Sequence, residues 1–187
     1  SPFKLKLSNE IYPAPDDPFE GLFGVFADSL PGGWGQLLLD RALMEREILI
    51  EDVTPLQRLS YVGNGGMGAL VYQPAIETVA QYNKKIELDS IAKEMNRVLE
   101  GNSSDVIEEL YQLGGSSGGA RPKILVGYNA KTNHLIRGVG NLVPGYEHWL
   151  IKFPSSVDRK DVANIEFAYS KMAAAAGIEM SSCRLFE

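Results

Sequence analysis

The chain has 187 residues, of which 18 are basic and 24 are acidic, so its formal net charge is −6. This acidic balance disfavours non-specific binding to nucleic acid or to an anionic membrane. A single cysteine excludes an internal disulfide framework and fits a reducing compartment, and two histidines argue against a histidine-built metal site. No apolar run approaches the roughly 20 residues that a membrane helix needs. We therefore expect a cytoplasmic protein without membrane contact.

The first half of the chain has mainly helical periodicity. Apolar residues recur at helical spacing over residues 36–47. Thr54 before Pro55 is a typical N-cap followed by a proline at the first helical position, and Gly63 ends the helix that they open. A short strand is expected at residues 69–72.

Two more helices are expected before the pattern changes. The first covers residues 86–100 and has an amphipathic pattern, and the second covers residues 103–113. Their expected N-caps are Asp89 or Ser90 for the first and Ser104 or Asp105 for the second.

The second half has the pattern of a small antiparallel sheet with one helix. After a glycine-rich loop, we expect two strands joined by a polar turn and a third strand that ends at Pro154. A helix over residues 158–176 should end at Gly177, and residues 178–187 should begin another strand. The predicted class is α+β.

The glycine-rich loop is the strongest candidate for a binding element. The segment GGSSGGARPK, residues 114–123, places four glycines and two serines in six residues directly before a strand. Glycine permits positive φ and lets a bulky anion approach the backbone N–H groups. The segment lacks the ending of a Walker A loop, and it does not open a helix as a dinucleotide fingerprint does. It matches a protein-kinase loop, which precedes a strand, although a flexible surface loop is the simpler alternative.

Lys152, in the strand HWLIKFP, is the second candidate. Its neighbours Leu150 and Ile151 are apolar, so we expect a mostly buried strand in which the lysine needs an anion or extends to solvent. Glu166 lies on the next helix, at a spacing that can bring it back towards this strand. In protein kinases a strand lysine contacts the ATP phosphates and pairs with a helix glutamate.

These segments together resemble the HipA-type serine/threonine kinases, the toxins of bacterial toxin–antitoxin modules. FGVFADSLPGGWGQLLLDR and TPLQRLSYVGNGGMGALVYQP look like the N-terminal part of that family. GGSSGGARPK is similar to its ATP-loop motif, HWLIKFP to its lysine strand, and NIEFAYSKMAAAAGIEMSSCRLFE to the helix and strand that follow. The resemblance extends over nearly the whole chain from about residue 19.

The resemblance implies a role for particular residues. Ser116 matches the autophosphorylated loop serine, and Ser117 is a rival that the sequence alone does not separate from it. Lys152 matches the nucleotide-binding lysine, and Glu166 is assigned as its orienting acid by analogy with kinases at large. The nucleotide-binding set is Ser117, Gly118, Gly119, Ala120, Arg121, Pro122, Lys123 and Lys152.

The resemblance also implies a domain organisation and partners. Residues 1–100 would form a HipA-type N-terminal subdomain, and residues 101–187 a kinase N-lobe. The catalytic aspartate, its asparagine partner and the Mg²⁺-binding aspartate belong to a C-lobe that would follow residue 187, so we expect no kinase activity from this chain alone. The full-length protein would use ATP and Mg²⁺, phosphorylate a protein substrate, bind a HipB-like helix-turn-helix antitoxin, and contact DNA only through that antitoxin.

Two other functions remain open at this point. The chain could be a stand-alone, non-catalytic module that binds a partner kinase or antitoxin, and a stop codon directly after Glu187 would favour it. A phosphate-binding domain unrelated to kinases rests on the glycine loop alone and leaves Lys152 unexplained.

Overall fold

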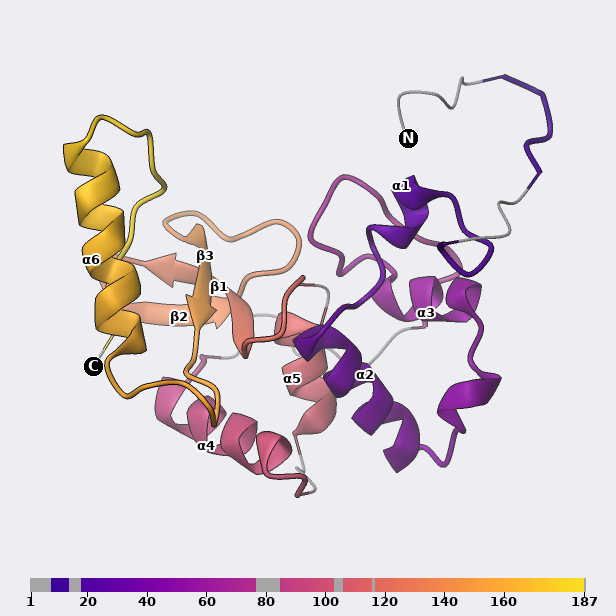
Figure 1. Ribbon diagram of the computed structural model, residues 1–187, viewed down its shortest axis with the longest axis horizontal. Helices are drawn as coiled ribbons and strands as arrows, with labels where there is room; N and C mark the ends of the chain where they lie inside the picture. The colour runs from indigo at the N-terminus through magenta and orange to yellow at the C-terminus, as the bar shows by residue number, and fades with distance from the viewer. Residues whose placement is uncertain (1–7, 14–17, 77–84, 103–105, 116, 187) are drawn as a thin grey trace.

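The computed structural model describes residues 8–13, 18–76, 85–102, 106–115 and 117–186 (Figure 1). Within these residues the fold is α+β, as predicted: helices form most of the first half, and a small antiparallel sheet follows. The helices are α1 (Gly24–Ala27), α2 (Trp34–Glu45), the short 3₁₀ helix η2 (Ile50–Asp52), α3 (Pro55–Val62), α4 (Leu88–Leu99), α5 (Ile107–Gly114) and α6 (Val162–Ala175). The strands are β1 (Lys123–Asn129), β2 (His134–Arg137) and β3 (Glu147–Lys152).

The helix predicted at Thr54 forms as expected. The Thr54 hydroxyl accepts a hydrogen bond from the Gln57 backbone N–H at 3.3 Å, and the Gln57 side chain accepts one from the Thr54 N–H at 2.8 Å. This reciprocal arrangement is a capping box. Pro55 lies in the first turn of the helix, and Gly63 is its C-cap.

The predicted N-cap of α4 is wrong. The helix begins at Leu88 with Glu87 at the N-cap, so both Asp89 and Ser90 lie inside the first turn. No side chain caps this end. The N-terminal boundary of α4 therefore coincides with the start of its apolar face and not with a capping residue. The expected caps of the next helix, Ser104 and Asp105, lie outside the described residues.

The strand expected at residues 69–72 does not form. The end of this segment and the residues just after it pair with the end of α3: Tyr72 N–H donates to the Gly63 carbonyl at 3.1 Å, and Ile76 N–H donates to the Ser60 carbonyl at 2.9 Å. A strand needs a neighbouring strand for its N–H and C=O groups, and here the helix end takes that place.

The sheet has the strand order β2-β1-β3, and both pairings are antiparallel. β1 is therefore the central strand, and Lys123 at its start lies directly opposite Lys152 at the end of β3. The helix after β3 ends as predicted: Gly177 has φ +81°, and Ile178 N–H donates to the Ala173 carbonyl at 3.0 Å. This is a Schellman ending.

The start of α6 and the segment after it differ from expectation. The helix begins at Val162, not at residue 158, because Asp158 instead closes a turn with Ser155. The strand expected after Gly177 is also absent over residues 178–186. That segment returns to the sheet through side chains: Phe186 packs edge-on against Tyr128 of β1, with ring centroids 5.6 Å apart.

A single hydrophobic cluster extends from α2 to the sheet. α5 lies between α2 and β1, which brings the buried side chains of all three elements together (Figure 1). Leu38, Leu110 and Ile124 are fully buried in this cluster. The cluster therefore includes residues on both sides of the expected domain boundary at residue 100, and the boundary itself stays a prediction. Among the described residues, no helix has the length and apolar character needed to cross a bilayer.

Candidate functional site

The glycine loop has a buried stem and an exposed tip. Gly114, Gly115, Pro122 and Lys123 are buried, whereas residues 118–121 are exposed. Ser117 is only 1% exposed, and its hydroxyl donates to the Gly114 carbonyl at 2.6 Å. Ser117 therefore holds the stem together, and Ser116 lies outside the described residues.

The exposed tip leaves backbone N–H groups available. Within the described part of the chain, the N–H groups of Gly118, Gly119, Ala120 and Arg121 donate to no acceptor. The carbonyls of Gly118 and Gly119 are engaged, because both accept from Lys123 Nζ, at 2.6 and 3.2 Å. An exposed run of free N–H groups is the arrangement that binds phosphate oxygens in glycine-rich loops.

Lys123 fastens the loop to the start of β1. Burial, and then the charge of Lys152 on the opposing strand, lower the pKa of its ammonium group below the usual value of 10.5. Like charges opposite each other on a sheet are unfavourable, so each lysine needs its own partner. Lys123 donates to the loop carbonyls, and Lys152 donates to Glu166 on α6. The family resemblance implies that Lys123 contacts the nucleotide, whereas its Nζ here binds the loop's own backbone.

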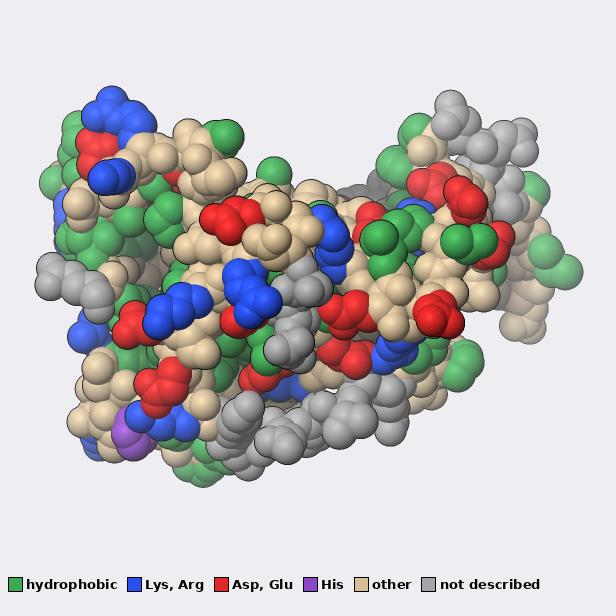
Figure 2. Space-filling view, turned by 90° about the horizontal axis from the view of Figure 1, so that it is seen from below, with side chains coloured by type: hydrophobic (Ala, Val, Ile, Leu, Met, Phe, Trp, Pro, Cys, Tyr) green, Lys and Arg blue, Asp and Glu red, His purple; other side chains and the backbone are tan. Residues whose placement is uncertain are grey.

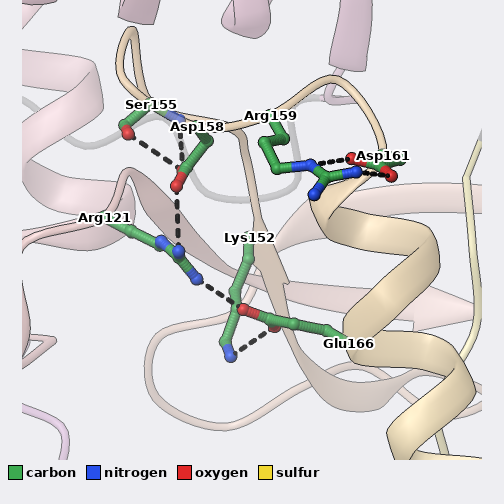
Figure 3. A network of polar contacts seen from close by, with 7 residues as sticks. All are labelled: Arg121, Lys152, Ser155, Asp158, Arg159, Asp161 and Glu166. Carbon is green, nitrogen blue, oxygen red and sulfur yellow. Dashed lines mark hydrogen bonds and ion pairs between the residues drawn. The ribbon is translucent and has the colours of Figure 1, made fainter.

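Lys152, Glu166 and Arg121 form one cluster (Figure 3). Lys152 Nζ donates to Glu166 Oε2 at 2.9 Å, and Arg121 Nη1 donates to Glu166 Oε1 at 2.6 Å. One carboxylate on α6 therefore lies between a cation from β3 and a cation from the glycine loop. The strand lysine and helix glutamate that were singled out in the sequence are in direct contact; their role in nucleotide binding stays a prediction.

Asp158 completes the cluster from the turn after β3. Its carboxylate accepts from the Ser155 backbone N–H and hydroxyl, both at 2.9 Å, and from Arg121 Nη2 at 2.8 Å (Figure 3). The Ser155 hydrogen bonds, and then the charge of Arg121, hold the pKa of Asp158 below its usual value of 3.8. Arg121 thus connects the loop to both the β3–α6 turn and α6.

The expectation that the lysine strand is mostly buried is wrong. β3 is an edge strand that pairs only with β1 among the described strands, and of its six residues only Ile151 is buried. The Lys152 side chain is 53% exposed, and it pairs with the Glu166 carboxylate at the surface of the protein. A half-solvated lysine beside an exposed loop is accessible to a ligand.

Ser155 and Asp158 were not predicted from the sequence. Their spacing of three residues, directly after a strand, is typical of a side-chain-capped turn, but a turn of this kind is usually only structural. The contact of Asp158 with Arg121, 37 residues earlier in the chain, has no local signal in the sequence.

No other chemistry is evident in the described ranges. They contain no group of three or more histidine, cysteine or acidic residues that could hold a metal ion. The face seen in Figure 2 has basic and acidic side chains interspersed. This fits the acidic composition and gives no continuous basic surface there for nucleic acid.

The fold and this cluster define a helical N-terminal part joined to a small antiparallel sheet with a glycine loop. The family model for the HipA N-terminal domain matches residues 1–73, and the model for the HipA-like C-terminal domain matches residues 115–187. The chain is therefore a HipA-like protein. Neither match includes residues 74–114. No curated protein and no solved structure matches the chain.

Proposed function

We propose that this chain is the N-terminal portion of a HipA-like, ATP-dependent protein serine/threonine kinase, with a C-lobe beyond residue 187, and that it binds the phosphates of ATP. Residues 1–100 would be the N-terminal subdomain, and residues 101–187 the kinase N-lobe. The observation that supports this most is the ion pair between Lys152 and Glu166 beside an exposed glycine loop. Protein kinases use the same residue types in the same chain order.

The loop, Lys152 and Arg121 would have different roles in binding the phosphates of ATP. The exposed N–H groups at the loop tip would donate to phosphate oxygens, and Lys152 would add a positive charge that Glu166 keeps in position. Arg121 is already engaged by Asp158 and Glu166, so we assign it to holding the loop rather than to the phosphates. ATP with Mg²⁺ would supply the phosphoryl group in the full-length protein.

The burial of Ser117 favours Ser116 as the phosphoacceptor. A hydroxyl that is 1% exposed and already donates to the Gly114 carbonyl is inaccessible to a phosphoryl donor unless the stem opens. Autophosphorylation of Ser116 would add about −1.5 to −2 charges to the loop. That charge would repel the γ-phosphate of ATP and inactivate the kinase.

By its family, the full-length protein would act as the toxin of a two-component module. Its partner would be a HipB-like helix-turn-helix antitoxin, so that contact with operator DNA is indirect. The interspersed charges and the net charge of −6 agree with a protein that does not itself bind the operator.

The test is MgATP binding to the chain, measured by isothermal titration calorimetry. Lys152→Ala removes a charge from the phosphate site, and charged hydrogen bonds are worth about 1.5–3 kcal/mol. We expect an affinity at least about tenfold lower. The matched control is Lys131→Ala, which removes an equal charge from the turn at the far end of β1. Equal binding by the wild type and Lys152→Ala would contradict the proposal, as would a wild type that binds no ATP at millimolar concentration. Where the reading frame continues past Glu187, the same pair is tested in the longer protein.

A stand-alone interaction module is the second candidate. It is favoured by large apolar side chains that are exposed on α6 and just after it, among them Tyr169, Met172 and Ile178. Such residues commonly mark a surface that another domain or protein contacts. A stop codon directly after Glu187, together with no ATP binding, would favour this function.

A further inference from the structure

The glycine loop rests on a second glycine-rich element that lies about 80 residues earlier in the chain. This element is the α2 glycine turn, residues 31–35, which leads into α2. The Trp34 backbone N–H donates to the Gly119 carbonyl at 3.0 Å. The two segments are therefore joined through their backbones, although they belong to different family matches.

The contact is close enough to exclude a side chain at Gly33 and at Gly35. A Cβ atom on Gly33 would lie 2.7 Å from the backbone carbonyl of Gly119, about 0.7 Å short of ordinary van der Waals contact, which begins near 3.4 Å. A Cβ on Gly35 would lie 2.0 Å from the Gly115 carbonyl oxygen. Both opposing atoms belong to the backbone, so neither can move without moving the loop itself.

The Trp34 side chain lies beside the stem of the loop. The indole is 1% exposed, and its Nε1 lies 3.4 Å from the position that a Cβ on Gly114 would take. A Cβ there would also lie 2.0 Å from the Lys123 carbonyl oxygen. Trp34 thus touches the loop at two places, its backbone at Gly119 and its indole beside Gly114.

The Gly119 carbonyl is important for the loop because it accepts two hydrogen bonds. This carbonyl accepts from both the Trp34 N–H and Lys123 Nζ, and Gly119 itself lies at the exposed tip. An acceptor held from two sides fixes the peptide plane, and with it the direction of the neighbouring N–H groups. Rigid, preorganised donors bind an anion better, since less freedom is lost on binding.

We propose that the α2 glycine turn positions the phosphate-binding loop, with Gly33, Trp34 and Gly35 as positioning residues. This inference rests on the proposed function, because it concerns the same nucleotide site. It assigns part of the nucleotide affinity to the N-terminal, non-kinase half of the chain. It also makes the turn a route by which loop movement reaches α2 and the core.

The test compares nucleotide affinity in Gly33→Ala and in two matched controls. Gly32→Ala adds a methyl group in the same turn where nothing lies within 4 Å, and Gly140→Ala adds one at a positive φ of +78° with nothing within 4 Å. Gly33 itself has φ +51°, so the second control separates backbone strain from the contact with the loop. We expect MgATP affinity to fall about tenfold in Gly33→Ala and to stay within about twofold of the wild type in both controls.

Trp34 fluorescence provides a second measurement that does not require Gly33→Ala to fold. In a Trp149→Phe background Trp34 is the only tryptophan. We expect its emission to change on MgATP addition, with a midpoint equal to the calorimetric Kd. The same titration of Gly33→Ala, where that variant folds, should shift this midpoint about tenfold.

The outcomes separate this inference from the proposed function. A wild type that binds no MgATP refutes the proposed function, and this inference with it. Binding that requires Lys152 but is unchanged in Gly33→Ala overturns only the positioning role. Where Gly33→Ala does not fold, binding detected by calorimetry without any change in Trp34 emission overturns it equally.

Discussion

Leu110→Ala should destabilise the whole chain as one unit. Leu110 is 0% exposed on α5, between α2 and β1. Removing a fully buried leucine side chain costs about 3 kcal/mol or more, because the core is close-packed and fills the cavity only in part. For a chain of this size we expect Tm to fall by about 6–12 °C.

The assay uses the two tryptophans as separate probes. Trp34 lies in α2, within the expected N-terminal subdomain, and Trp149 lies on β3, within the expected N-lobe. Trp149→Phe leaves the first probe and Trp34→Phe leaves the second, and Leu110→Ala is compared with its parent in each background. We expect urea unfolding to show the same loss of stability at both probes, because Trp34 belongs to the central cluster and Trp149 packs against it.

The matched control is Leu56→Ala on α3, where the leucine is 67% exposed. The same chemical change at an exposed site should alter stability by less than about 0.5 kcal/mol. Destabilisation at Trp149 with an unchanged midpoint at Trp34 would refute the reasoning. It would show that residues 1–100 fold independently of α5 and the sheet.

Two further predictions concern the site. Asp158→Asn should lower Tm at pH 7, because a carboxylate whose folded-state pKa lies below 3.8 contributes stability above that value and loses it as the pH falls through the folded-state pKa. The difference in Tm from the wild type should narrow towards pH 3. Asp161→Asn removes the exposed pair with Arg159 at the N-cap of α6, where no side chain caps the helix, and should change Tm little at either pH. In the longer protein with ATP and Mg²⁺, intact-mass spectrometry should find the added phosphate in Ser117→Ala but not in Ser116→Ala, and a phosphate retained by Ser116→Ala would show that the choice of acceptor is wrong.

The sequence alone predicted the elements whose ends depend on nearby residues. The capping box at Thr54 and the glycine ending at Gly177 use hydrogen bonds within one or two turns of a helix, so local residue types are enough. The α+β class also followed from periodicity. The pairing of Lys152 with Glu166 was anticipated because only 14 residues separate them across one strand-to-helix connection.

Tertiary structure decided what depends on distant partners. Residues 69–72 and 178–186 have strand-like sequences, but a strand forms only where its backbone pairs with another strand. Here Tyr72 bonds to the end of α3 and Phe186 packs on Tyr128 instead. The contacts of Arg121 with Asp158 and of Trp34 with Gly119 join residues 37 and 85 positions apart. No periodicity or spacing signals such contacts, because each forms only when segments far apart in the chain pack against each other.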